Sequence, residues 1–192
     1  MKKFITVFVL LSYSVFADDI SDFEIDGISI GDSLLDYYSF SEIENNTNYQ
    51  IYDYMKEPKF ISAGFNTNVD SKYDFIQFTF ETNDTNKIIY GITGSIDYEG
   101  KISNCYEKLA QVSDELSLIF KNSTKIEDKT RKHPADPTGK SYGTQTYFYL
   151  NGDDIVSISC YDWSKEMETN DRFAISMWSY ELHSWGSKNQ DK

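Results

Sequence analysis

Apolar residues recur every three or four positions around residues 104–120, which is the spacing of one face of an α-helix. Asn104 is a favourable N-cap, and Glu107 stands three positions later, where it could bond back to the cap. The pattern predicts one long amphipathic helix over about residues 104–120. Its apolar stripe consists of Ile102, Cys105, Leu109, Val112, Leu116 and Ile119.

Most of the remaining chain shows the two-residue alternation of β-strands. The clearest case is 73–81, where Ile76, Phe78 and Phe80 alternate with polar residues. Gly91 and Gly94 indicate a bulge or the close approach of another segment. Further strands are predicted over residues 23–27, 49–55, 59–66, 87–98, 142–150, 155–163 and 172–180.

Short helices are predicted near the N-terminus, because Ser33/Asp36 and Ser39/Glu42 both have capping-box spacing. Residues 121–141 lose any periodicity and are rich in basic residues, so they are predicted to form a long loop.

These elements predict an α+β fold, predominantly antiparallel β-sheet, in a single domain over residues 18–186. Residues 73–78 resemble residues 142–147, so a tandem of two helix-plus-sheet units, with halves 18–100 and 101–186, is an alternative. Residues 187–192 are predicted to be a disordered tail.

The first 17 residues have the pattern of a secretory signal peptide. Two lysines precede an uncharged, mostly apolar run that ends at Ala17, and the polar mature chain begins with Asp18. The sequence therefore predicts an exported protein, periplasmic or secreted, of 175 mature residues. No stable membrane insertion is expected after cleavage.

The mature chain is strongly acidic. The signal peptide takes two of the 18 basic residues and leaves all 31 acidic ones, so the mature net charge is −15. Such a surface repels phosphate backbones, and no nucleic-acid partner is expected.

The chain has two cysteines, Cys105 and Cys160, which in an exported protein are expected to form a disulfide. That bond would place the face of strand 155–163 that carries Val156 and Ile158 under the helix. A two-residue turn at 151–152 would add Tyr147 and Tyr149 to this face. A three-residue turn would add Phe148 and Leu150 instead.

The stretch F-E-I-D-G-I-S-I-G-D-S-L-L-D-Y, residues 23–37, resembles the opening of a family of small signal-peptide-bearing proteins of marine alphaproteobacteria. That family has no assigned activity, so the resemblance implies no catalytic residues. Residues 28–38 and the order of elements also resemble BamE-like domains and the tandem domains of beta-lactamase inhibitory protein. This second resemblance implies an envelope-assembly or inhibitor role.

No motif predicts a cofactor, a metal site or a catalytic group. His133 and His183 lack the spacing of a zinc site. The many acidic pairs leave open a small carboxylate-dependent hydrolase of envelope or extracellular polymers.

Four aromatic residues provide the main functional hypothesis: Tyr161, Trp163, Trp178 and Tyr180. Aromatic rings exposed on a sheet can stack on sugars or anchor a protein partner. We therefore expect a non-catalytic binding or interaction module, with a protein or carbohydrate partner, rather than an enzyme.

Overall fold

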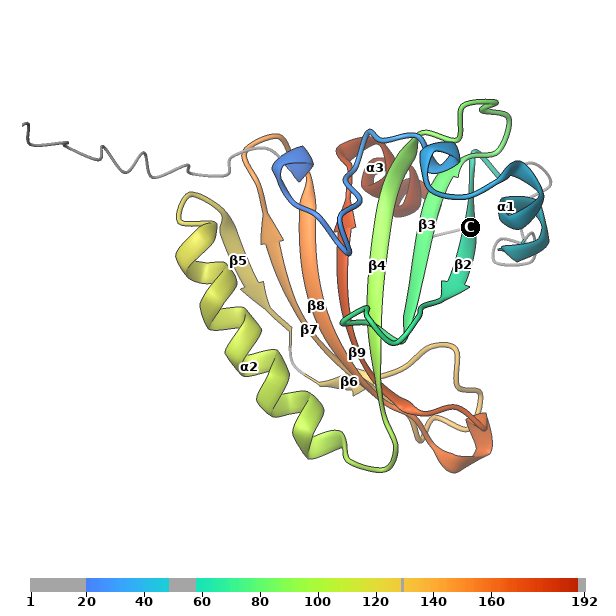
Figure 1. Cartoon of the computed structure of the whole chain (residues 1–192). Coiled ribbons are helices and arrows are strands. Elements are labelled where there is room, and N and C mark those ends of the chain that lie inside the picture. The colour runs from blue at the N-terminus through green and yellow to red at the C-terminus, as the bar shows by residue number, and fades with distance from the viewer. Residues whose placement is uncertain (1–19, 49–57, 129, 190–192) are drawn as a thin grey trace, which may run out of the picture.

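The computed structural model describes residues 20–48, 58–128 and 130–189. Within them, nine strands form one sheet in the order β1-β2-β3-β4-β9-β8-β7-β5, with β6 paired to β7 (Figure 1). Every pairing is antiparallel, so the α+β fold class with a mainly antiparallel sheet is confirmed. The strands are β1 (Thr47–Asn48), β2 (Phe60–Asn66), β3 (Phe75–Glu81), β4 (Ile89–Tyr98), β5 (Thr124–Glu127), β6 (Arg131–Lys132), β7 (Tyr142–Tyr149), β8 (Ile155–Asp162) and β9 (Asp171–Trp178).

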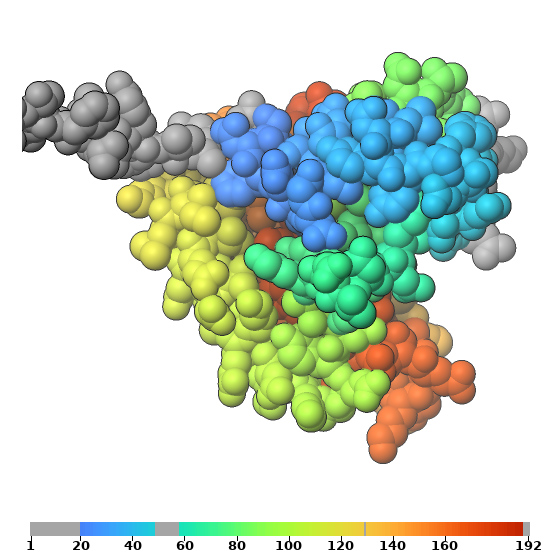
Figure 2. All heavy atoms as spheres, viewed as in Figure 1, coloured from blue at the N-terminus to red at the C-terminus, as the bar shows by residue number. Residues whose placement is uncertain are grey.

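Helical segments lie on both sides of this sheet. The N-terminal segment and α2 cover the near face in Figure 1, and Figure 2 shows that their side chains and the β2–β3 connection cover most of this face. Helix α3 lies against the opposite face. The segments are η1 (Ile20–Asp22), η2 (Leu34–Asp36), α1 (Phe40–Asn46), α2 (Ile102–Ile119), η4 (Lys165–Met167) and α3 (Tyr180–Asn189).

The main core lies between the near face and these covering segments. Strand alternation sends Ile76, Phe78 and Phe80 of β3 into it, and all three are buried. The N-terminal segment contributes Leu34 and Ile43, which are completely buried. The apolar side chains of the alternating strands therefore face the side of the sheet on which α2 lies.

Helix α2 is attached to the sheet by a disulfide between Cys105 and Cys160 of β8. Both cysteines are completely buried, and Leu109 and Leu116 bury the same side of the helix. The expected N-cap at Asn104 is wrong: α2 begins at Ile102, and the Asn104 N–H donates to the Lys101 carbonyl, 2.9 Å away. Asn104 thus lies inside the first turn, where it cannot cap the helix.

The β7–β8 hairpin adopts the second of the two registers left open by the sequence. Leu150 N–H donates to the Asp154 carbonyl at 2.9 Å, which leaves a three-residue turn. Phe148 pairs with Val156 on the disulfide side, and Tyr147 pairs with Ser157 on the other.

Two N-terminal predictions are corrected. Residues 23–27 form no strand, because the chain reverses at Asp26 and Gly27, both with positive φ, and only Ile25 and Ile28 form a bridge. The helix expected at Ser33 is a single 3-10 turn. By contrast, α1 has the predicted capping box between Ser39 and Glu42.

The long loop predicted over 121–141 is also interrupted by structure. Strands β5 and β6 both pair with β7. Both are exposed and mainly charged, with Ile126 the one apolar residue, so they have no apolar alternation by which the pattern could reveal them. The strand predicted over 49–55 lies outside the described residues.

The C-terminal strand is shorter than predicted, and a helix follows it. The strand ends at Trp178, and the Ser179 hydroxyl accepts from the Leu182 N–H at 3.3 Å as α3 begins. Leu182 packs on Gly91, where a Cβ would come within 2.6 Å of its methyl group. Residues 187–189, which we assigned to the tail, belong to α3.

The order of strands is similar in the two halves of the sheet. Strands β2, β3 and β4 form one meander, β7, β8 and β9 form another, and β4 pairs with β9 at the centre. An edge strand that follows a helix flanks each meander: β1 after α1, and β5 after α2.

Removing the disulfide by the double substitution Cys105→Ala/Cys160→Ala should lower the free energy of unfolding by about 4 kcal/mol, because the bond closes a long loop. The two cysteines are 55 residues apart in sequence. Denaturant unfolding of oxidised wild type and variant measures this difference. Reductant should destabilise the wild type equally and leave the variant unchanged; a loss below about 1 kcal/mol would contradict the expectation.

Candidate binding groove

A groove of about 950 Å³ lies on the sheet face opposite α2. Its floor is made of the residues that alternate with the core residues along β2, β3, β4 and β9. Hydroxyl groups dominate this floor, in contrast to the apolar face beneath α2. They belong to Ser62, Thr79, Thr93, Ser95 and Ser176.

Many floor groups pair with a neighbour on the adjacent strand. The hydroxyls of Ser62 and Thr79 lie 2.9 Å apart, and those of Thr93 and Ser176 lie 2.8 Å apart. A hydroxyl can donate and accept at once, so each pair keeps hydrogen-bonding capacity for a ligand above it.

Strand β7 extends the polar floor with an amide and a phenol. The Gln145 side-chain amide donates to the Tyr161 hydroxyl at 3.2 Å, and Gln145 Oε1 accepts from the Tyr147 hydroxyl at 2.6 Å. Burial, with a smaller contribution from the nearby Asp128 charge, raises the pKa of Tyr147 to about 12. The phenol therefore stays neutral and serves as a hydrogen-bonding group.

One end of the groove is an aromatic cluster of Tyr161, Trp163 and His133. The His133 ring centroid lies 4.4 Å from that of Trp163 and 5.2 Å from that of Tyr161. His133 Nδ1 accepts a hydrogen bond from the Ala135 N–H at 3.2 Å, which requires that nitrogen to be unprotonated. Burial lowers the pKa of His133, so the imidazole is neutral near pH 7.

The other end is a second set of rings contributed by β7, β9 and α3. Trp178 and Tyr149 stand at the ends of their strands, and α3 adds His183 and Trp185. The ring centroids of Tyr149 and His183 are 6.2 Å apart, and Trp185 packs edge-on against Phe60 at 5.3 Å. All four rings of this set are half-buried.

Charged groups of the groove stand at its margin, and two of its cations are ion-paired. Arg131 pairs with Asp128. Arg172 Nε lies 2.8 Å from Asp97 Oδ1. Among the described lining residues, Asp128 is the one carboxylate. Lys132, the third cation of the described lining, is exposed on β6. Two of the three cations of the lining are thus neutralised by a partner carboxylate.

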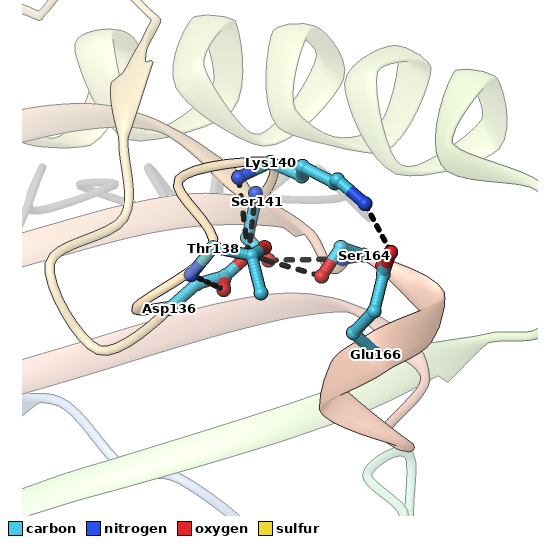
Figure 3. Close-up of polar contacts among 6 residues, drawn as sticks. All are labelled: Asp136, Thr138, Lys140, Ser141, Ser164 and Glu166. Atoms are coloured by element: carbon cyan, nitrogen blue, oxygen red, sulfur yellow. Dashed lines mark hydrogen bonds and ion pairs between the residues drawn. The ribbon is translucent and has the colours of Figure 1, made fainter.

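The loop that carries His133 is folded around the carboxylate of Asp136 (Figure 3). Asp136 Oδ2 accepts from the Ser141 N–H at 2.9 Å and from the Ser141 hydroxyl at 2.6 Å, and Oδ1 accepts from the Thr138 N–H at 2.7 Å. These bonds hold the pKa of the Asp136 carboxyl well below its usual range, with the Ser141 hydroxyl the largest contributor.

The same carboxylate joins this loop to the connection between β8 and β9. The Ser164 hydroxyl donates to Asp136 Oδ2 at 2.9 Å, and the Ser164 N–H donates to the Ser141 hydroxyl at 2.9 Å. An ion pair between Lys140 and Glu166 closes the junction (Figure 3). Ser164 follows Trp163 directly, so Asp136 fixes the loop of His133 against the strand end of Trp163.

Three of the four predicted binding residues line this groove: Tyr161, Trp163 and Trp178. Tyr180 does not. It is the first residue of α3, its side chain is 48% exposed, and its N–H donates to Asp154. The sequence predicts a strand over residues 172–180, whereas the change to helix after Trp178 turns Tyr180 away from the groove.

Sequence reasoning did not assign six further aromatic residues to the groove: Phe75, His133, Tyr147, Tyr149, His183 and Trp185. Phe75 alternates with the core residues of β3, and the faces of Tyr147 and Tyr149 depend on the hairpin register, which the sequence leaves open. Only the pairing of β5 and β6 with β7, and the packing of α3 on β4, bring His133, His183 and Trp185 to the groove.

Comparison of the chain with protein-family models, with curated proteins and with solved structures gave no match. In the described part of the chain, no helix is both long and apolar enough to cross a membrane. The disulfide fits an exported protein, since such bonds persist in oxidising compartments.

The Asp136→Asn substitution should lower the thermal unfolding midpoint by several degrees near neutral pH. The carboxyl pKa is lower in the folded than in the unfolded protein, so the ionised group stabilises the fold above about pH 4, and this contribution disappears as pH falls further. The gap between wild type and variant should therefore narrow toward about pH 2, as followed by circular dichroism.

Asp153→Asn is the matched control, because Asp153 is exposed in the β7–β8 turn and loses the same charge. Its midpoint should stay close to that of the wild type. An Asp136→Asn deficit that is independent of pH would show that the ionised form is not what holds the loop.

Proposed function

We propose that this chain is an exported, non-catalytic binding module that holds its ligand in the groove opposite α2. The observation that carries the proposal is the division of the sheet into two faces. One face is closed by α2 and the N-terminal segment, and the other is an open groove with a hydrogen-bonding floor and half-buried aromatic rings.

The chemistry of the groove favours binding over the hydrolase alternative. A carboxylate-dependent glycoside hydrolase needs two carboxyl groups facing each other within about 5–10 Å. Among the described lining residues, the carboxylate available is Asp128, and it is paired with Arg131. Hydroxyls, amides and aromatic rings are groups that position a ligand without reacting with it.

We also propose that the two halves, 18–100 and 101–186, are a tandem of helix-plus-sheet units. The first residues of β7, β8 and β9 follow those of β2, β3 and β4 by 82, 80 and 82 residues. This equates β3 with β8, whereas the local resemblance between residues 73–78 and 142–147 compares β3 with β7. Helix α2 would then be the long amphipathic helix of the second unit, and both units would contribute to one continuous floor.

This arrangement is in keeping with the resemblance to BamE-like domains and to beta-lactamase inhibitory protein. An envelope-assembly or inhibitor role is therefore the second candidate for the same groove. It would differ from the first in the kind of partner, which would be a protein.

Trp163→Ala should reduce retention of the native ligand on the immobilised mature protein by at least about tenfold, equivalent to about 1.4 kcal/mol. The probe is a clarified extract of envelope and growth medium. Tyr180→Ala, which removes a ring of α3 outside the groove, should bind as the wild type does. Equal losses in both variants, or no loss in either, would contradict binding in the groove.

Export should be visible in the intact mass of the protein recovered from periplasm or medium. Cleavage after Ala17 gives a chain that begins at Asp18, because the apolar run and the small residue at 17 match the signal-peptidase pattern. Recovery of the protein from the cytoplasm with residues 1–17 attached would refute the proposal of export.

A further inference from the structure

We propose that the ligand of the groove is an uncharged oligosaccharide that lies along the strands and stacks on aromatic rings at both ends. This inference rests on the proposed binding function and specifies the ligand's chemical class. It follows from the chemistry of the floor, the placement of the rings and the position of the charges.

The floor offers the groups that pair with sugar hydroxyls. Thr93, Ser176 and Gln145 can each donate and accept, and they already form hydrogen bonds with neighbours in the groove. A ligand bearing many hydroxyls can extend these networks without leaving a buried group unpaired. A ligand with an apolar body would instead cover polar groups that have lost access to water, which is unfavourable.

Most of the rings stand at the two ends of this floor, and Tyr147 and Phe75 are the two that lie between them. Tyr161 is paired with Arg172 at one end of β8 and β9, and Ile155 is paired with Trp178 at the other. Six residues of strand separate these two positions, which corresponds to ~20 Å. The groove therefore suits an elongated ligand that has a flat apolar face at each end.

This placement argues against a protein as the main occupant. At protein interfaces, the aromatic residues that contribute most of the binding energy cluster near the geometric centre and a polar rim surrounds them. Here the centre is mainly polar: Thr93, Ser176 and Gln145 lie there with Tyr147, whose phenol donates to Gln145, and all the indole and imidazole rings lie at the ends. A sugar ring has both an apolar face and a hydroxylated edge, so it can use both parts of the groove.

The charges argue for a neutral sugar. The mature protein carries a net charge of −15, which disfavours uronic acids and sulfated glycans at long range. At the groove itself, two of the three lining cations are neutralised by partners, Arg131 by Asp128 and Arg172 by Asp97, and the third, Lys132, is exposed on β6 at one margin.

Calorimetric titration of the oxidised mature protein should detect binding of at least one uncharged hexasaccharide from a panel of cellohexaose, laminarihexaose, maltohexaose, xylohexaose and mannohexaose. The corresponding disaccharide should bind at least about tenfold more weakly, because it cannot reach both sets of rings. Oligoguluronate, an acidic glycan, should not compete.

Trp163→Ala and Trp178→Ala remove one ring at each end and should each weaken hexasaccharide binding by about tenfold. Both should also reduce the advantage of the hexasaccharide over the disaccharide. Tyr180→Ala should change neither quantity. Circular dichroism verifies that the variants are folded, and quenching of wild-type tryptophan fluorescence by the sugar is a second measurement that needs no variant.

Selective destruction of either the proteins or the glycans in the extract distinguishes this inference from the proposed function. Retention that depends on Trp163, survives proteinase K and is lost after periodate oxidation supports a glycan, even one outside the panel. Retention that is lost to proteinase K and survives periodate overturns the glycan and leaves the binding function standing. If no retention depends on Trp163 and no oligosaccharide of the panel binds, both the binding function and the glycan ligand are overturned.

Discussion

The disulfide between Cys105 and Cys160 is the constraint on which the arrangement of this protein depends. It attaches α2 to one face of β8, and Leu109 and Leu116 bury the same side of the helix. Because strand side chains alternate, this single attachment assigns Val156 and Ile158 to the core and their neighbours to the opposite face. The same bond that closes the core therefore decides which residues are left for the groove.

The groove depends on register as much as on residue type. The three-residue turn between β7 and β8 places Tyr147 and Tyr149 beside the groove and Phe148 in the core. A shift by one residue would exchange these two sets and bury phenols beneath α2. At the sheet's end, Asp136 contributes a different kind of control, because its hydrogen bonds to Ser141 and Ser164 hold His133 beside Trp163.

Sequence reasoning succeeded where local pattern and burial agree. The alternation in β3 and the pairing of the two cysteines were predictable because their residues pack on one core, and the capping box of α1 was predictable because it is a local hydrogen-bond pattern. It failed for β5 and β6, whose mainly charged and exposed residues show no apolar alternation. It also failed at Tyr180, because the strand ends at Trp178 and a helix without a strong apolar stripe begins at Tyr180.

The sequence by itself determined the strands with alternating apolar residues, the covalent link between α2 and the sheet, and the candidate rings Tyr161, Trp163 and Trp178. It could do so because periodicity, turn residues and cysteine count are local or nearly local properties. Only the tertiary structure decided that these rings stand at the two ends of one hydroxyl-lined groove, and that α3 and the loop around Asp136 complete it. That decision depends on strand order, hairpin register and packing between segments distant in sequence, which no local pattern encodes.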